Sequence, residues 1–245
     1  MRVYRFEWWH AVSRNLPRVQ QMAAMALAAA LLLNACAAMG RSAQRDGPQP
    51  AGQPTAASAV ASRETVIIVM GDSITAGLGV QLEEAYPALL EARLRAEGHA
   101  VRVVNSGVSG ETTAGGLRRA DFIARQKGDI VIVALGGNDA LRGIEPVAAA
   151  AQLESIISIL AQSGTRVVLA GMYAPRNLGS EYVGSFDAMY PALAEKYALP
   201  LIPFLLEGVA LDPVLNQPDG IHPTPAGQRI IMEQNIYPVI VGLLK

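Results

Sequence analysis

Short apolar runs alternate with longer amphipathic segments between residues 65 and 243. The runs are rich in β-branched residues, a composition typical of strands that are buried on both faces of a parallel sheet. They predict five strands, at residues 65–70, 99–104, 129–135, 166–170 and 200–202. Leucines at helical spacing, terminal glycines and first-turn prolines predict the helices between them. These helices are expected at residues 83–97, 117–126, 146–162 and 185–197, and a last one opens at Thr224.

The regular order of strand and helix predicts an α/β fold. Five strand–helix repeats indicate a parallel five-stranded sheet covered on both faces, and right-handed crossovers make it a doubly wound three-layer sandwich. Neither an internal repeat nor a second domain is visible in the sequence, so one domain is expected over residues 64–245.

The first 35 residues have the composition of an export signal. Four arginines are followed by an apolar run at residues 22–33, which is too short to span a bilayer and has the length of a signal-peptide apolar region. The run leads into Leu33, Asn34, Ala35 and Cys36, which resemble the lipobox of bacterial lipoproteins. Cys36 is therefore the predicted lipidation site. Ala35, Cys36 and Ala37 also fit ordinary signal cleavage, which would leave a soluble periplasmic protein.

Residues 36–63 are rich in Ala, Gln, Pro, Gly and Ser and have no periodic apolar pattern, so a flexible linker is expected there. Cys36 is the one cysteine in the sequence, which excludes an intrachain disulfide and a cysteine zinc site. The four arginines and one glutamate of residues 1–35 leave 16 basic and 20 acidic side chains in the remainder, a net charge of −4. This charge does not favour binding to nucleic acid.

Ser73 is the candidate nucleophile. It follows the first apolar run, and the carboxyl ends of parallel strands form the edge where ligands bind in open α/β folds. The first turn of the next helix also offers backbone N–H groups to a developing negative charge. The alternative is a serine that only begins the helix.

His222 is the candidate base, because His10 lies in the export segment and His99 begins a strand at the opposite sheet edge. Asp219, three residues before His222, is positioned to orient the imidazole so that it accepts a proton from Ser73. The alternative is a turn acid followed by a histidine at a helix entry.

An oxyanion needs preorganised donors, and three are available. They are the backbone N–H of Ser73, the backbone N–H of Gly107 and the side-chain amide of Asn138. A turn glycine and a turn-capping asparagine are the structural alternatives. Asp72 and Asp139 are expected to tie their turns through backbone hydrogen bonds.

Four sequence blocks together resemble the GDSL (SGNH) hydrolase superfamily. They are Gly71-Asp72-Ser73, Gly107, Gly136-Gly137-Asn138-Asp139 and Asp219-Gly220-Ile221-His222-Pro223. Further stretches resemble one branch of it, the bacterial periplasmic acyl-CoA thioesterase I, arylesterase and lysophospholipase enzymes; these stretches are residues 109–113, 141–143 and 218–223. The resemblance covers about residues 65–242. The Gly-x-Ser-x-Gly elbow of α/β-hydrolases is absent from the sequence, which argues against that fold.

This resemblance implies a flavodoxin-like sheet, a triad of Ser73, His222 and Asp219, the oxyanion donors given above, and no cofactor or metal. The implied substrate is a small-molecule or lipid acyl ester or thioester. Apolar residues near the site favour a hydrophobic acyl group: Leu78, Val80, Leu141, Met172, Tyr173 and Ile221. The last four are the candidate substrate-binding residues, and the alternative for all six is ordinary packing. The only membrane contact expected is a lipid anchor at Cys36.

Two other function classes fit parts of the pattern. A metal hydrolase would use Asp72, Asp139, Asp219 and His222, although one histidine with carboxylates is a thin zinc shell. A flavodoxin-like binding module without turnover would leave Ser73, His222 and the oxyanion donors without a role.

Overall fold

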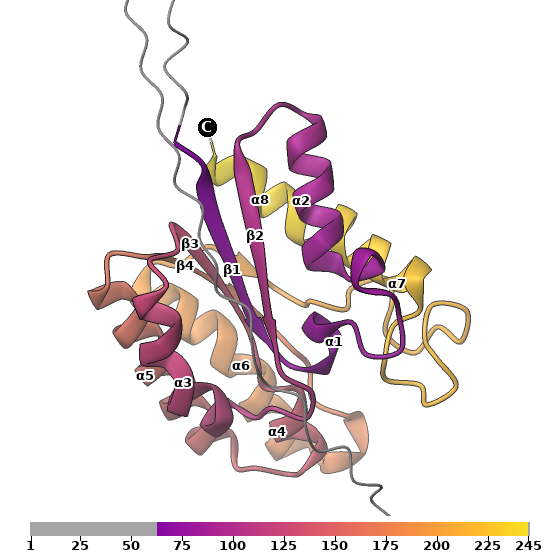
Figure 1. Ribbon diagram of the computed structural model, residues 1–245. Helices are drawn as coiled ribbons and strands as arrows, with labels where there is room; N and C mark the ends of the chain where they lie inside the picture. Colours follow the sequence, from indigo (N-terminus) through magenta and orange to yellow (C-terminus); the bar gives the residue numbers. More distant parts are fainter. Residues whose placement is uncertain (1–62, 245) are drawn as a thin grey trace, which may run out of the picture. The chain divides into compact units, whose positions relative to one another are not determined.

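Five parallel strands form the centre of the structure, a computed structural model that describes residues 63–244. The strands are β1 (Thr65–Gly71), β2 (Val101–Gly107), β3 (Ile130–Ala134), β4 (Arg166–Ala170) and β5 (Leu201–Ile202). Their order in the sheet is β2-β1-β3-β4-β5, and every neighbouring pair is parallel (Figure 1). This is the flavodoxin-like order, which confirms the predicted fold class.

Helices cover both faces of the sheet, as Figure 1 shows. The longer helices of one group are α3 (Thr113–Arg125), α5 (Pro146–Gln162) and α6 (Ser180–Tyr197). The other group consists of α2 (Tyr86–Ala96), α7 (Pro225–Ile230), the π-helical turn Ile231–Ile236 and α8 (Tyr237–Leu243). The described residues contain no helix that combines the length and the apolar character needed to cross a membrane.

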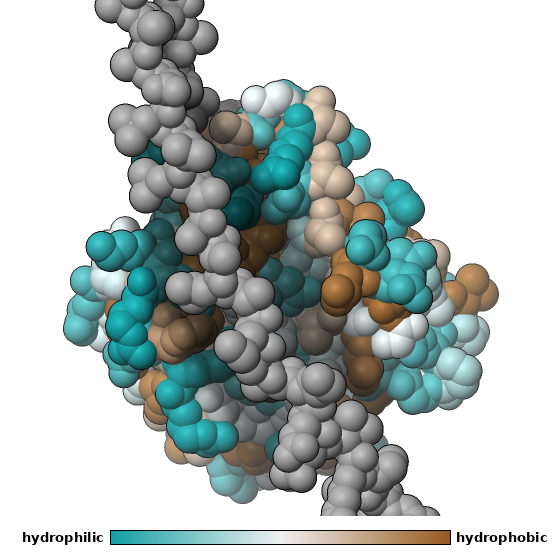
Figure 2. All heavy atoms as spheres, viewed as in Figure 1, coloured by the Kyte–Doolittle hydropathy of each residue, from teal (hydrophilic) through white to brown (hydrophobic). Residues whose placement is uncertain are grey.

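The core lies between the sheet and these helices. All five residues of β3 are buried, which explains why its sequence is apolar throughout rather than alternating. The largest fully buried side chains include Tyr86, Phe186 and Tyr190. On the face in view, Figure 2 shows many hydrophilic residues, with hydrophobic residues among them on the side where α7 and the segment before it lie.

Several predicted boundaries are wrong. The helix predicted at residues 83–97 is divided into a 3₁₀ turn (Leu82–Glu84) and α2, because Ala85 is extended and Pro87 fits only the first turn of a helix. The helix predicted to begin at residue 117 begins at Thr113, because the Thr112 side chain caps it by accepting from the Gly115 N–H at 3.3 Å.

Two stretches outside the predicted strands and helices belong to regular elements. Strand β2 continues to Gly107, and residues after Gly136 form the short helix α4 (Gly137–Leu141). Helix α6 begins five residues before the predicted start at residue 185. The predicted export signal, the lipidation site Cys36 and nearly all of the linker at residues 36–63 lie outside the described residues.

Candidate active site

Ser73 is the first residue of α1 (Ser73–Ala76), directly after β1. The chain turns sharply here, and a Cβ on Gly71 would lie 2.0 Å from the Thr75 Oγ1, so only glycine fits. The Asp72 carboxylate caps the new helix, since its Oδ1 accepts from the Ile74 N–H at 3.0 Å. Ser73 is thereby held at the carboxyl edge of the sheet.

His222 lies beside Ser73 although the two are 149 positions apart in the sequence. The His222 Nε2 is 2.8 Å from the Ser73 Oγ, and the His222 Nδ1 is 2.6 Å from the Asp219 Oδ2. Because an ionised carboxylate only accepts hydrogen bonds, the Nδ1 carries the proton and the Nε2 is free to accept from the serine hydroxyl. The arrangement is that of a nucleophile, a base and an orienting acid.

Local hydrogen bonds hold the turn that carries Asp219 and His222. The Asp219 Oδ1 accepts from the N–H groups of Ile221 and His222, each at 3.0 Å. The Gln217 N–H donates to the His222 carbonyl at 2.7 Å, and the Gln217 side chain donates to the Leu78 carbonyl just after α1, also at 2.7 Å. Gln217 therefore links the histidine turn to the segment that follows Ser73.

Two acids in the site have shifted pKa values in opposite directions. The hydrogen bond from His222 and the two backbone N–H donors lower the pKa of Asp219 to about 2, so it is ionised at neutral pH. Burial raises the pKa of Asp72 to about 6, against the lowering effects of the Ile74 N–H and the Asn138 amide.

The other two expected oxyanion donors lie at the same edge, and each already has a polar partner. The Gly107 N–H donates to the Asn105 Oδ1 at 3.0 Å, and the Asn138 Nδ2 donates to the Asp72 Oδ2 at 3.2 Å. An amide nitrogen carries two hydrogens, so Asn138 retains one for a ligand, whereas the Gly107 N–H would be shared between Asn105 and an oxyanion.

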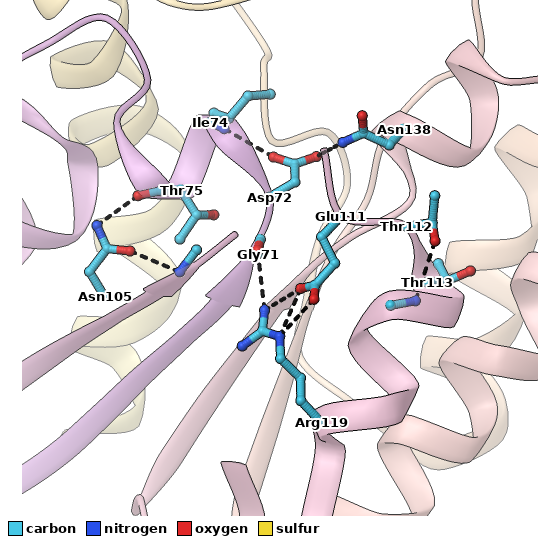
Figure 3. Close-up of polar contacts among 12 residues, drawn as sticks. Gly71, Asp72, Ile74, Thr75, Asn105, Glu111, Thr112, Thr113, Arg119 and Asn138 are labelled. Carbon is cyan, nitrogen blue, oxygen red and sulfur yellow. Dashed lines mark hydrogen bonds and ion pairs between the residues drawn. The ribbon is translucent and has the colours of Figure 1, made fainter. Parts of the chain in front are cut away.

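Gly107 is also required sterically. A Cβ at this position would lie 2.3 Å from the backbone nitrogen of Ala76, so the absence of a side chain lets β2 approach α1 closely. The Asn105 Nδ2 donates to the Thr75 carbonyl at 2.8 Å and ties the same two elements together (Figure 3). Sequence reasoning missed this role of Asn105.

A further contact that was not predicted from the sequence holds the turn between β1 and Ser73. Arg119 of α3 forms an ion pair with Glu111, with its Nε 2.9 Å from each carboxylate oxygen, and its Nη2 donates to the Gly71 carbonyl at 3.3 Å (Figure 3). The Glu111 side chain is buried, which makes this pair better shielded from solvent than a surface ion pair.

Asp139 binds outside its own turn. Its carboxylate accepts from the Thr113 N–H at 2.9 Å and from the Thr113 hydroxyl at 2.6 Å, and so ties α4 to the start of α3. Within residues 63–244, no three His, Cys, Asp or Glu side chains are grouped closely enough to hold a metal ion.

A groove of about 870 Å³ opens beside Ser73, His222 and Asn138. The four apolar residues predicted near the substrate, Leu141, Met172, Tyr173 and Ile221, all line it. The segment after β5 adds wall residues that the sequence analysis did not name, including Phe204, Leu206 and Leu211. The Phe204 ring stacks on Tyr173 with centroids 4.4 Å apart. Phe204 comes just after the end of a predicted strand, and this position was the sequence signal that could have identified it as a wall residue of the groove.

Known proteins of similar sequence and structure identify the family of this chain. Residues 69–230 match the GDSL-like Lipase/Acylhydrolase family. Esterase TesA of Pseudomonas aeruginosa is 42% identical over 183 residues, which are 73% of this chain and 89% of that protein. Thioesterase 1/protease 1/lysophospholipase L1 of Escherichia coli is 34% identical over 184 residues, 74% of this chain and 87% of that protein. The crystal structure of AlinE4, a SGNH-hydrolase family esterase, is 44% identical, covers 74% of this chain and 97% of its own, and has a TM-score of 0.62.

The match covers most of the described residues and includes each of the polar segments at the sheet edge. The chain therefore belongs to the GDSL-like lipase/acylhydrolase family, and it is an esterase of the GDSL type.

Proposed function

We propose that this protein hydrolyses carboxylic esters or thioesters of hydrophobic acyl groups through a serine nucleophile. The observation that carries the proposal is the chain of contacts from Ser73 to His222 to Asp219, with distances of 2.8 and 2.6 Å. It supports general-base activation of a hydroxyl beside an open groove.

In the proposed acylation step, the Ser73 Oγ attacks the acyl carbon while the His222 Nε2 takes the hydroxyl proton. The tetrahedral oxyanion would receive hydrogen bonds from the N–H groups of Ser73 and Gly107 and from the Asn138 amide. Collapse of this intermediate breaks the bond to the leaving group, which takes the proton from His222. Asp219 keeps the imidazole in the tautomer that accepts the serine proton.

In deacylation, water replaces the leaving group. His222 takes a proton from the water as it attacks the acyl carbon, and then returns that proton to the Ser73 oxygen as the acid leaves. The proposed reaction needs no cofactor, because water and the side chains of the site account for every proton and bond.

The apolar groove supports a hydrophobic acyl moiety as the bound group. The names of relatives include arylesterase, thioesterase and lysophospholipase, so aryl esters, acyl thioesters and lysophospholipids are the proposed substrate classes. The proposed reaction involves no nucleic acid.

The test is hydrolysis of p-nitrophenyl esters with acyl chains of about two to sixteen carbons, together with an acyl-CoA and a lysophospholipid. Wild type should hydrolyse some of these, and Ser73→Ala should lose at least about 10³-fold in kcat because it has no nucleophile. Equal rates for wild type and Ser73→Ala would overturn the proposal.

We also propose that the protein is exported and anchored to a membrane by lipid at Cys36, with residues 37–63 as a tether. The support is the apolar run that ends at the lipobox-like residues before Cys36. Labelling with radioactive palmitate should mark the wild-type protein and not Cys36→Ser. Incorporation of label into both would contradict the anchor, and incorporation into neither would favour ordinary signal cleavage and a soluble periplasmic enzyme.

A further inference from the structure

Asp72 is a buried acid that binds two donors from different helices (Figure 3). Its Oδ1 accepts from the Ile74 N–H of α1 at 3.0 Å, and its Oδ2 accepts from the Asn138 Nδ2 of α4 at 3.2 Å. The residue is only 4% exposed. One carboxylate therefore joins the helix that begins with Ser73 to the helix that carries Asn138.

We infer that Asp72 is a positioning residue that holds the Asn138 amide in the one orientation in which it acts as a donor at the groove. The inference rests on the proposed function, in which Asn138 donates to the oxyanion. Asp72 itself does not touch the reacting atoms in this account. It acts through Asn138.

The reason is the different hydrogen-bonding capacity of the two groups. A side-chain amide has a donor end and an acceptor end, and rotation by about 180° exchanges them. An ionised carboxylate has only acceptors, so the amide nitrogen must face Asp72. One amide hydrogen then binds the Asp72 Oδ2, and the second remains for a ligand in the groove that Asn138 lines.

Asparagine at position 72 would no longer fix the orientation of the Asn138 amide. It has a single acceptor oxygen for two donors, the Ile74 N–H and the Asn138 amide. With the oxygen toward Ile74, an NH₂ group would face the Asn138 Nδ2. Rotation of the Asn138 amide relieves that donor–donor contact and moves its nitrogen away from the place it holds in the wild type.

A purely structural role for Asp72 can be separated from this positioning role. Asparagine, aspartate and serine are about equally good at the position before a helix. Asp72→Asn and Asp72→Ser should therefore both keep the cap on the Ile74 N–H. If capping were the whole role of Asp72, both variants would keep the wild-type kcat.

The experiment is steady-state hydrolysis of p-nitrophenyl butyrate by wild type, Asp72→Asn, Asp72→Ser, Asn138→Ala and the double variant Asp72→Asn/Asn138→Ala. Loss of one oxyanion donor costs about 10²–10³ in kcat, so Asn138→Ala should fall in this range. The two Asp72 variants should lose about 10- to 100-fold in kcat, with KM within about twofold of the wild type, because Asn138 remains but is misoriented. The double variant should equal Asn138→Ala, because Asp72 has nothing left to orient.

Asp129→Asn is the matched control. Asp129 also accepts from a backbone N–H, that of Val66 at 2.8 Å, but at the amino end of β1. It should keep the wild-type kcat. Circular dichroism should show that each variant is folded, and if Asp72→Asn does not fold, Asp72→Ser decides the question.

Wild-type kcat in a folded Asp72→Asn or Asp72→Ser would overturn the inference, as would a kcat loss that is equally large with and without Asn138. Failure of the proposed function looks different, because Ser73→Ala would then keep its activity. Loss of activity in Ser73→Ala with no effect at Asp72 rejects the positioning role alone.

Discussion

Replacing Asp72 by asparagine is expected to change how the stability of the protein depends on pH. Burial raises the pKa of Asp72 from 3.8 to about 6 in the folded state, whereas the unfolded chain keeps the ordinary value. Between these two values the unfolded state loses its proton first. The free energy of unfolding of the wild type therefore falls as pH rises from about 3.8 to about 6. Asparagine does not titrate, so the variant lacks this fall.

The size of the effect follows from the pKa difference. Each pKa unit corresponds to about 1.4 kcal/mol, so a shift from 3.8 to about 6 is worth about 3 kcal/mol. Relative to wild type, Asp72→Asn should gain about this much stability between pH 3.5 and pH 7. The substitution also removes hydrogen bonds of Asp72, and their loss changes the free energy of unfolding at pH 3.5 and at pH 7 alike. It therefore moves the curve of the stability difference against pH up or down without changing its rise.

Urea unfolding at half-unit pH steps would measure this difference. A positive charge on His222 lowers the pKa of Asp72, so a parallel comparison in the His222→Gln background removes this influence. Asp219→Asn is a control of opposite sign. The pKa of Asp219 is lowered in the folded wild type, so ionised Asp219 stabilises the wild type above about pH 4, and this contribution is lost as pH falls toward about 2. A difference curve for Asp72→Asn that stays flat between pH 3.5 and pH 7, or falls, would refute the reasoning.

Two further predictions concern packing around the site. Gly107→Ala would place a methyl group 2.3 Å from the Ala76 nitrogen, so it should lower stability by about 1–3 kcal/mol and also lower kcat, as measured by thermal unfolding and ester hydrolysis. Gly184→Ala, at a helical position with open space, should not lower stability, and equal destabilisation by both would contradict the steric argument. Phe204→Ala removes a ring that stacks on Tyr173, so kcat/KM for a dodecanoate ester should fall about 3- to 10-fold more than for an acetate ester. An unchanged ratio would mean that the acyl chain does not reach Phe204.

The sheet and the approach of Ser73 to His222 were predictable from the sequence for one physical reason. Buried parallel strands are apolar throughout, so their ends are visible as abrupt changes to polar residues. The loops at those ends must then gather at one edge, whatever their separation in sequence. The three histidines in the chain left a single candidate for the base.

Contacts that depend on tertiary packing were not predictable in the same way. The hydrogen bond of Asn105 with the Thr75 carbonyl and that of Arg119 with the Gly71 carbonyl join elements whose spacing no local pattern encodes. The start of α3 was missed because the cap at Thr112 lies in a glycine-rich stretch that resembles a loop. The second contact of Asp72 was missed because it depends on where α4 lies relative to α1.

The most direct test of the central claim, that Ser73 is a nucleophile activated by His222, is peptide mapping after reaction with a fluorophosphonate. The phosphonate should be found on the peptide that contains Ser73 in the wild type and be absent from Ser73→Ala. Labelling of His222→Ala should be slower by about 10²-fold or more, because the base that removes the hydroxyl proton is gone. Attachment to a different residue, or equal labelling rates for wild type and Ser73→Ala, would contradict the account.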